Sequence, residues 1–198
     1  MKTWGEIKQA ILNKIFLEED EARQQGYSAK FQQLANEGLN IIANSVKPKI
    51  STIVVTVVEK EEGKEKEDSE YYVGELIEMP EDFLSFSDHI NYKDGYEDPE
   101  IVYITDTAIA LPEAGVYTIH YNGLWDTIDA SEASDDVKIN IPANILNCIP
   151  SYVASQVLSQ DDIQRSTVLK NEFELMLARL DTNVFYESNH FKSSGGWY

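Results

Sequence analysis

The chain has 198 residues, of which 42% are hydrophobic, enough for one large domain or two small ones with a buried core. Its formal net charge of −19 argues against adhesion to DNA phosphates, because such binding needs Lys and Arg to displace counterions; acidity alone also confers solubility. A single cysteine, Cys148, excludes an internal disulfide and a cysteine-based zinc site. No apolar run approaches the roughly 20 residues of a membrane span, and residues 1–9 do not read as a secretory signal, so we expect a protein made and assembled in a reducing cytoplasm.

Two helices are predicted at the N-terminus. Thr3 and Glu6 have the spacing of a capping box, and apolar residues follow at steps of three and four: Trp4, Ile7, Ile11 and Ile15. An acidic run at residues 18–21 leads into a loop, and we interpret it as a solvated turn rather than a metal site, because it lacks the Asp/Gly spacing of a calcium loop. A second helix is predicted from about residue 27 to residue 46, ended by Pro48.

The period then changes to that of strands. Residues 50–58, ISTIVVTVV, are rich in β-branched side chains and form the clearest predicted strand. Residues 59–70 are almost all charged, which indicates a hairpin tip or, alternatively, a finger that binds a basic partner. A return strand is expected at 71–77, a strand or short helix at 83–90, and short strands at 101–105, 107–111, 116–121 and 137–141.

Residues 142–180 predict a pair of helices. The first begins at Pro142 and has an apolar stripe of residues four apart, Ile145, Ile149, Val153 and Val157. Pro150 lies inside this pattern and predicts a kink or a restart of the helix. Ser159 and Asp162 approximate a capping box for the second helix, whose stripe is Leu169, Phe173, Met176 and Leu180.

The predicted fold class is α+β. Two short helical pairs need a partner to bury their stripes, so we expect a four-helix bundle formed by the N- and C-terminal pairs, with an antiparallel β domain inserted between them. The corresponding segments are 1–47 and 142–180 for the bundle, 48–141 for the β domain, and 181–198 for an extended C-terminal tail.

The tail is rich in aromatic residues and contains Gly195 and Gly196. Flexible aromatic residues suit docking into pockets of a partner, and wrapping onto the chain's own helices is an equal alternative. The candidate docking residues are Phe185, Tyr186, Phe191, Trp197 and Tyr198.

Nothing in the sequence predicts an enzyme, a cofactor or a metal site. The three histidines, His89, His120 and His190, lie far apart without metal-ligand spacing, and His120 is expected to be a surface or hydrogen-bonded residue of a strand. Cys148 lies on an apolar helix, which favours a buried structural thiol. Neither a G-x-S-x-G elbow nor a P-loop occurs.

Several motifs in order along the chain carry a resemblance to a known family. They are MPEDF at 79–83, GVYTIHYNG at 115–123, IP at 141–142, PSYVASQVL at 150–158, the acidic pair at 161–162 and NEFELML at 171–177. In these motifs, and in a long N-terminal helix that ends before Lys47 and Pro48, the chain resembles the head–tail connectors of tailed bacteriophages. The resemblance covers most of the chain, and its weight comes from the order and spacing of motifs that are individually weak.

The resemblance implies a structural virion protein of the neck, assembled in the host cytoplasm. About twelve copies would form a ring beneath the portal protein, extend the DNA channel and present a platform for the downstream neck or tail protein. DNA would pass through the channel without sequence-specific binding, and terminal extensions of family members engage the portal, which favours docking of the tail. A head-closure neck ring, a monomeric β-domain binding module for a saccharide or host protein, and an uncharacterised enzyme are the alternatives.

Acidic loops are the second set of candidate partner residues. They would line the channel or contact basic patches of a partner. The residues are Glu18, Glu19, Asp20, Glu21, Glu61, Glu62, Glu65 and Glu67.

Overall fold

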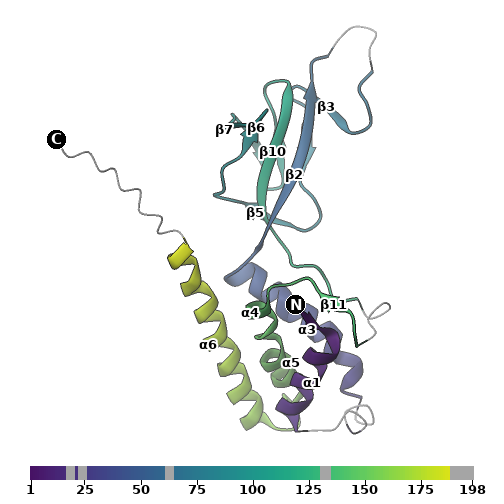
Figure 1. Cartoon of the computed structure of the whole chain (residues 1–198), viewed down its shortest axis with the longest axis vertical. Coiled ribbons are helices and arrows are strands. Elements are labelled where there is room, and N and C mark those ends of the chain that lie inside the picture. Colours follow the sequence, from purple (N-terminus) through teal and green to yellow (C-terminus); the bar gives the residue numbers. More distant parts are fainter. Residues whose placement is uncertain (17–20, 22–25, 61–64, 130–134, 188–198) are drawn as a thin grey trace, which may run out of the picture. The chain divides into compact units, whose positions relative to one another are not determined.

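The computed structural model describes residues 1–16, 21, 26–60, 65–129 and 135–187, with side chains up to residue 180. The chain forms two compact units (Figure 1). The first, here called the helical unit, combines Met1–Lys47 with Trp125–Tyr198, and the second, called the β unit, is Pro48–Leu124. The chain thus leaves the helical unit once and returns to it at Trp125, earlier than the expected return after residue 141. None of the helices in the described part of the chain is long and apolar enough to cross a membrane.

The helical unit contains five described helices and a small sheet. The helices are α1 (Trp4–Ile15), α3 (Ser28–Ser45), α4 (Ala143–Leu146), α5 (Ile149–Val157) and α6 (Ile163–Glu187), and β1 (Lys2–Thr3) pairs antiparallel with β11 (Lys138–Ile139). The predicted capping box at the start of α1 is confirmed. Thr3 Oγ1 accepts a hydrogen bond from the Glu6 N–H at 3.2 Å, and the Thr3 N–H donates to Glu6 Oε2 at 2.9 Å. The predicted second helix is confirmed as α3.

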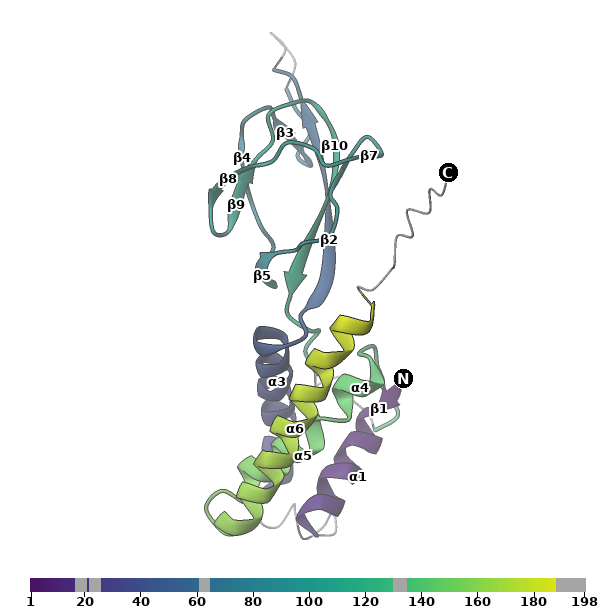
Figure 2. The same ribbon diagram turned by 90° about the vertical axis from the view of Figure 1, so that its left-hand side faces the viewer.

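Helix α5 lies at the centre of the helical unit, where it packs against α1, α3 and α6 (Figure 2). It is buried around most of its circumference, because Ile149, Val153 and Ala154 face the core together with the small polar residues Ser151 and Ser155. Short side chains on α5 allow its neighbours to approach closely. Gly38 on α3 also allows close approach to α5, because a Cβ atom at this position would lie only 2.9 Å from Cδ1 of Tyr152.

Two helix starts in the C-terminal part follow local rules. The predicted interruption at Pro150 is a restart: α4 ends at Leu146, and Pro150 lies in the first turn of α5, where its missing N–H costs no hydrogen bond. The predicted capping box that begins at Ser159 is wrong. Asp162 is the cap of α6, because its Oδ1 accepts the Arg165 N–H at 3.0 Å, whereas the Ser159 hydroxyl donates back to the Gln156 carbonyl.

The β unit is built from two sheets (Figure 2). The main sheet has the order β3-β2-β10-β6-β7, and β5 also pairs with β10; its strands are β2 (Lys49–Val58), β3 (Glu70–Tyr72), β5 (Phe83–Phe86), β6 (Tyr92–Lys93), β7 (Tyr96–Glu97) and β10 (Gly115–Gly123). The second sheet has the order β4-β9-β8, formed by β4 (Leu76–Glu78), β9 (Ala108–Ala110) and β8 (Val102–Thr105).

The long antiparallel pair β2–β10 organises the β unit. Its register runs without a break from Gly115 opposite Val57 to Gly123 opposite Lys49. On the inner face of the pair, Val55, Tyr117 and Ile119 are buried in a core that also takes in Ile77 and Ile109 of the second sheet. One face of the main sheet therefore packs against the other sheet, and the core of the β unit is separate from that of the helical unit.

The predicted fold class is wrong. The chain is a mixed α/β protein in which the described residues form three sheets with eleven strands, rather than a four-helix bundle with an inserted antiparallel β domain. The helices share one core, but α5 lies at its centre and is contacted by α1, α3 and α6, unlike a helix of a four-helix bundle, which has one side in solvent. A sheet, β1–β11, lies within the helical unit, and β3 runs parallel to β2. The two-residue strands β1, β6 and β7 have no hydrophobic period of their own, so the sequence pattern did not predict them, whereas β11 lies inside the strand expected at 137–141.

Candidate interaction surfaces

The candidate docking residues of the tail lie at and beyond the end of the described chain. Helix α6 continues to Glu187, so that the positions of Phe185 and Tyr186 are helical, seven residues past the expected end of the helix. The remaining three, Phe191, Trp197 and Tyr198, lie outside the described residues. Docking of this segment to a partner stays a prediction.

The candidate acidic residues belong to two different units. Glu18, Glu19 and Asp20 in the helical unit, and Glu61 and Glu62 in the β unit, lie outside the described residues. Glu21, Glu65 and Glu67 are exposed. Lys66, between the last two, forms an ion pair with Glu75 at 2.6 Å, and this ion pair, together with a hydrogen bond from the Tyr72 N–H, lowers the pKa of the Glu75 carboxyl. The end of the charged loop is therefore held to the strands by its own lysine.

Helix α6 has apolar residues on two of its faces. The predicted inner stripe packs into the helical unit, where Leu169, Phe173 and Leu180 are buried. On another face, Val168 and Leu175 are 66% and 63% exposed. These two residues are seven positions apart, so they lie on the same side of the helix, two turns from one another. We call this side the outer stripe of α6.

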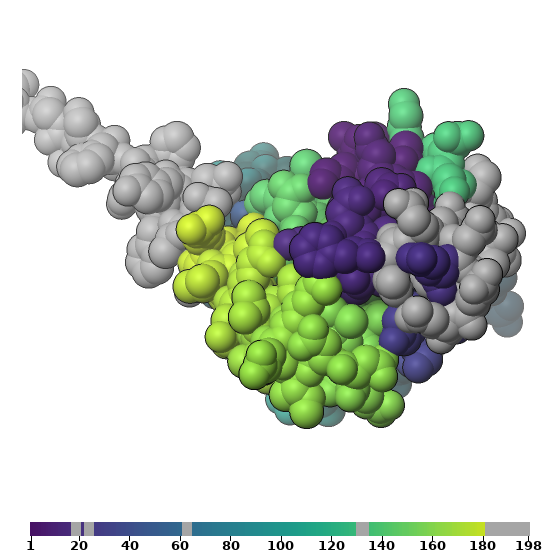
Figure 3. All heavy atoms as spheres, turned by 90° about the horizontal axis from the view of Figure 1, so that it is seen from below, coloured from purple at the N-terminus to yellow at the C-terminus, as the bar shows by residue number. Residues whose placement is uncertain are grey.

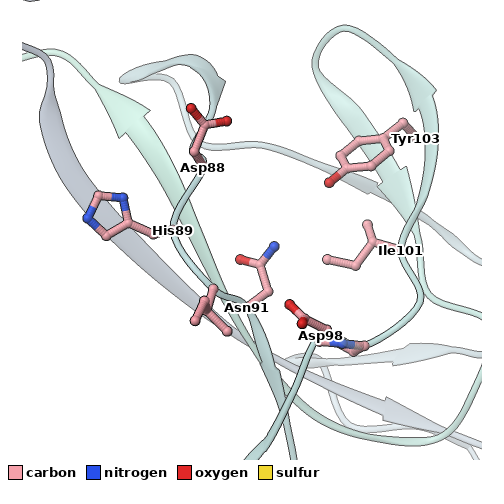
Figure 4. Close-up of a pocket in the computed structure, with 8 residues that line it drawn as sticks. Asp88, His89, Asn91, Asp98, Ile101 and Tyr103 are labelled. Carbon is pink, nitrogen blue, oxygen red and sulfur yellow. The ribbon is translucent and has the colours of Figure 1, made fainter. Parts of the chain in front are cut away.

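The β unit contains a small polar cavity of about 290 Å³ (Figure 4). Its walls include the side chains of Asp88, Asn91, Asp98, Ile101 and Tyr103. The backbone holds this arrangement, since the Asp98 N–H donates to the Asn91 carbonyl and the Asn91 side chain accepts the His120 N–H at 2.8 Å. Carboxylate, amide and phenol groups around a cavity of this size could bind a small ligand rich in hydroxyl groups.

His89, in the segment after β5, lies beside His120 of β10, although 31 positions separate them in the sequence. Their ring centroids are 6.1 Å apart, and His89 is also one of the residues that line the cavity (Figure 4). Each ring nitrogen Nδ1 has a hydroxyl partner, Ser87 for His89 and Thr52 for His120. The prediction that His120 is a hydrogen-bonded strand residue is confirmed. Among the described residues, no three His, Cys, Asp or Glu side chains come together in a way that could hold a metal ion.

Cys148 is a buried thiol, as predicted. It lies just before α5 in the core of the helical unit, and its Sγ–H donates to the Asn144 carbonyl. Burial raises the pKa of this thiol to about 11. The thiolate needed for nucleophilic chemistry is therefore disfavoured near neutral pH.

Sequence reasoning missed the outer face of the β2–β10 pair. We define this outer face as the eight side chains that point away from the inner core: Ile50, Thr52, Val54, Thr56, Val116, Thr118, His120 and Asn122. The signal was present in ISTIVVTVV, where apolar residues occupy both alternating positions. A strand with only one buried face would alternate apolar and polar residues.

A search of protein-family models finds no match to the chain, and a search of curated proteins finds none either. The expected similarity to head–tail connectors therefore stays a prediction, based on the motifs quoted above and on their order.

Proposed function

We propose that this protein is a structural adaptor at the neck of a tailed bacteriophage. In this proposal, copies of the chain form a ring beneath the portal protein, extend the DNA channel and present a platform to the next neck or tail protein. The proposal is supported by the connector-like motifs, which are spread over both units of the chain.

The observation that carries the proposal is the outer stripe of α6. The inner stripe already packs α6 into the helical unit, and Val168 and Leu175 leave a second pair of exposed apolar side chains, which a neighbouring subunit would cover. Figure 3 shows residues of α6 forming the surface of one side of the helical unit. In a ring, each subunit uses one surface to contact a different surface of its neighbour, and the outer stripe of α6 supplies the first of these surfaces.

The charge of the protein fits a channel through which DNA moves. A ring of copies that each carry −19 repels the phosphate backbone, so DNA would not adhere to it. The C-terminal segment beyond α6 would reach the portal.

The proposal is tested by negative-stain electron microscopy of the protein alone and mixed with the portal protein of the same genome. We expect a ring stacked beneath the portal. Changing Val168 and Leu175 to Glu should prevent ring closure, because each adds a carboxylate to the apolar contact. Lys170→Glu is the matched control: it causes the same change in net charge from another face of α6, so its ring should form normally.

Two results would contradict the adaptor function. The adaptor function is wrong if the wild-type protein remains a monomer and does not bind the portal. If V168E/L175E forms the ring as well as the wild-type protein does, the outer stripe of α6 does not contact the neighbouring subunit.

A second candidate function is a monomeric binding module, and the cavity of the β unit favours it. Asp88, Asn91, Asp98 and Tyr103 offer the hydrogen-bonding groups that a saccharide would use. This function predicts a protein that binds an oligosaccharide in the absence of a portal, with affinity lost in Asn91→Ala or Asp98→Ala.

A further inference from the structure

The outer face of β2–β10 has no charged residue, although the β unit around it is strongly acidic. Residues 48–124 contain 18 of the 35 acidic residues but five of the 16 basic residues of the chain, a formal charge of −13. In the register of the two strands, Ile50 is opposite Asn122, Thr52 opposite His120, Val54 opposite Thr118, and Thr56 opposite Val116. Asp, Glu, Lys and Arg are absent from all eight positions.

The same face leaves large apolar side chains in solvent. Val54 is 67% exposed, Ile50 44% and Val116 43%, whereas the opposite face of the same strands is buried in the core of the β unit. An uncharged, β-branched row of this kind is typical of a sheet surface that is covered by another protein.

Carboxylates border this face at both edges of the main sheet. The β2–β3 register places Glu70 beside Thr56, on the same side of the sheet. Across the sheet, Tyr92 lies beside Thr118, and Glu97 of β7 lies beside Tyr92. Near β3 two lysines lie over the Tyr72 ring, Lys60 and Lys66, and the second is paired with Glu75. Glu70 and Glu97, set against Lys60, leave this rim acidic overall, in a unit whose formal charge is −13.

We infer that the outer face of β2–β10 binds a protein that presents apolar side chains flanked by Lys or Arg. The apolar centre would be covered on binding, and the basic residues would meet Glu70 and Glu97 at the rim. Such an arrangement, with an apolar centre and a charged rim of complementary sign, is typical of specific protein contacts. Nucleic acid does not fit, because phosphates would be repelled by the same rim.

A second copy of the chain fits this face less well than a basic partner does. Two identical copies would bring their acidic rims together. The two strands alone offer on the order of 250 Å² over four rows of side chains, against about 800 Å² per partner in a typical stable interface. Attraction at the rim is therefore needed, and a basic partner supplies it. This inference does not depend on the adaptor function, and its test uses only the protein itself.

The test uses a charge-reversed version of the same chain as the partner. The E70K/E97K variant carries the same apolar face with a basic rim, so it presents the chemistry that we infer. Mixed with the wild-type protein at low salt in sedimentation velocity experiments, it should form a mixed complex that neither protein forms alone. Raising the salt concentration should weaken the complex, because the rim contacts are screened.

Two further variants identify the surface. Val54→Asp in the wild-type chain should weaken the complex by at least about tenfold, since it adds a carboxylate at the centre of the contact. Because Val54 is largely exposed, this variant should fold normally, and circular dichroism checks this. E78K/D106K is the matched control: it has the same charge change on exposed residues of the second sheet region, and it should not bind the wild-type protein. If E70K/E97K does not fold, E97K alone replaces it.

The inference is wrong if E70K/E97K and wild type do not associate, if the complex is insensitive to V54D, or if E78K/D106K binds equally well. Self-association of the wild-type chain that V54D abolishes would also overturn it, since the face would then belong to a contact between copies.

Discussion

Gly38 determines how closely α3 approaches α5. A Cβ atom at this position would lie 2.9 Å from Cδ1 of Tyr152 and 3.3 Å from Cδ1 of Ile149. The first distance is shorter than side chains tolerate, and the Tyr152 ring has little room to move because it also packs against Phe173, with ring centroids 5.1 Å apart. Helices α3, α5 and α6 can therefore pack closely here because residue 38 has no side chain.

We predict that Gly38→Val destabilises the protein by about 1–3 kcal/mol, because the added atoms overpack the contact with Tyr152. Chemical denaturation followed by circular dichroism measures the change. The control is Asn40→Val at an exposed position of α3, which carries the same cost of a β-branched residue in a helix without the clash. Equal stability of the two variants would show that the α3–α5 contact is not close at Gly38.

At the scale of elements, α6 shows how a local cap is chosen. Both Ser159 and Asp162 are good N-cap residues, and the sequence alone favoured the earlier one through its spacing. In the structure, residues 158–161 form turns after α5, and the chain can enter the next helix only after that reversal. The geometry between two packed helices, rather than the intrinsic preference of either residue, decides which one caps α6.

Asp162→Ala should therefore destabilise the protein by about 1 kcal/mol, because the Arg165 N–H loses its partner and a carboxylate leaves the positive end of the helix. Ser159→Ala should change the stability by less than about 0.5 kcal/mol, because Ser159 lies on the surface and caps no N–H. Thermal unfolding of both variants compares the two effects. If Ser159→Ala destabilised the protein more than Asp162→Ala, Ser159 rather than Asp162 would be the N-cap of α6.

The path of β3 is a second example at this scale. A charged segment between two strands predicts a hairpin with antiparallel strands, yet β3 runs parallel to β2. The eleven residues between Val58 and Glu70 are long enough to carry the chain back along β2 before β3 begins. Parallel pairing requires such a connection, and no residue type in it distinguishes this path from a loose hairpin.

At the scale of the whole molecule, one contact joins the two segments of the helical unit that flank the β unit. The Trp125 indole N–H donates to the Lys47 carbonyl at 2.8 Å. The chain therefore leaves and re-enters the helical unit at neighbouring points, and the two units have separate cores. A domain inserted in this way can be removed without opening the core of its host.

We predict that replacing residues 48–124 with a short Gly-Ser linker leaves the helical unit folded. Circular dichroism should show a helical protein with a cooperative thermal transition, and amide spectra should be well dispersed. The matched control cuts instead at 48–141, the boundary predicted from sequence, and should be less stable because it removes β11 and the buried residues Ile128 and Ile139. An unfolded 48–124 deletion would show that the helical unit depends on the β unit.

The sequence by itself determined the local elements whose signals lie within a few residues. The capping box and stripe of α1, the extent of α3, the interruption at Pro150 and the strand at residues 50–58 all follow from side-chain spacing and backbone chemistry. It also determined the acidity and the apolar character of both faces of β2. The central position of α5, the parallel strand β3, the meeting of His89 with His120 and the acidic rim of the outer face were decided by tertiary structure alone. Each of these depends on which distant segments pack together, and the free energy of that packing is shared among residues that show no pattern along the chain.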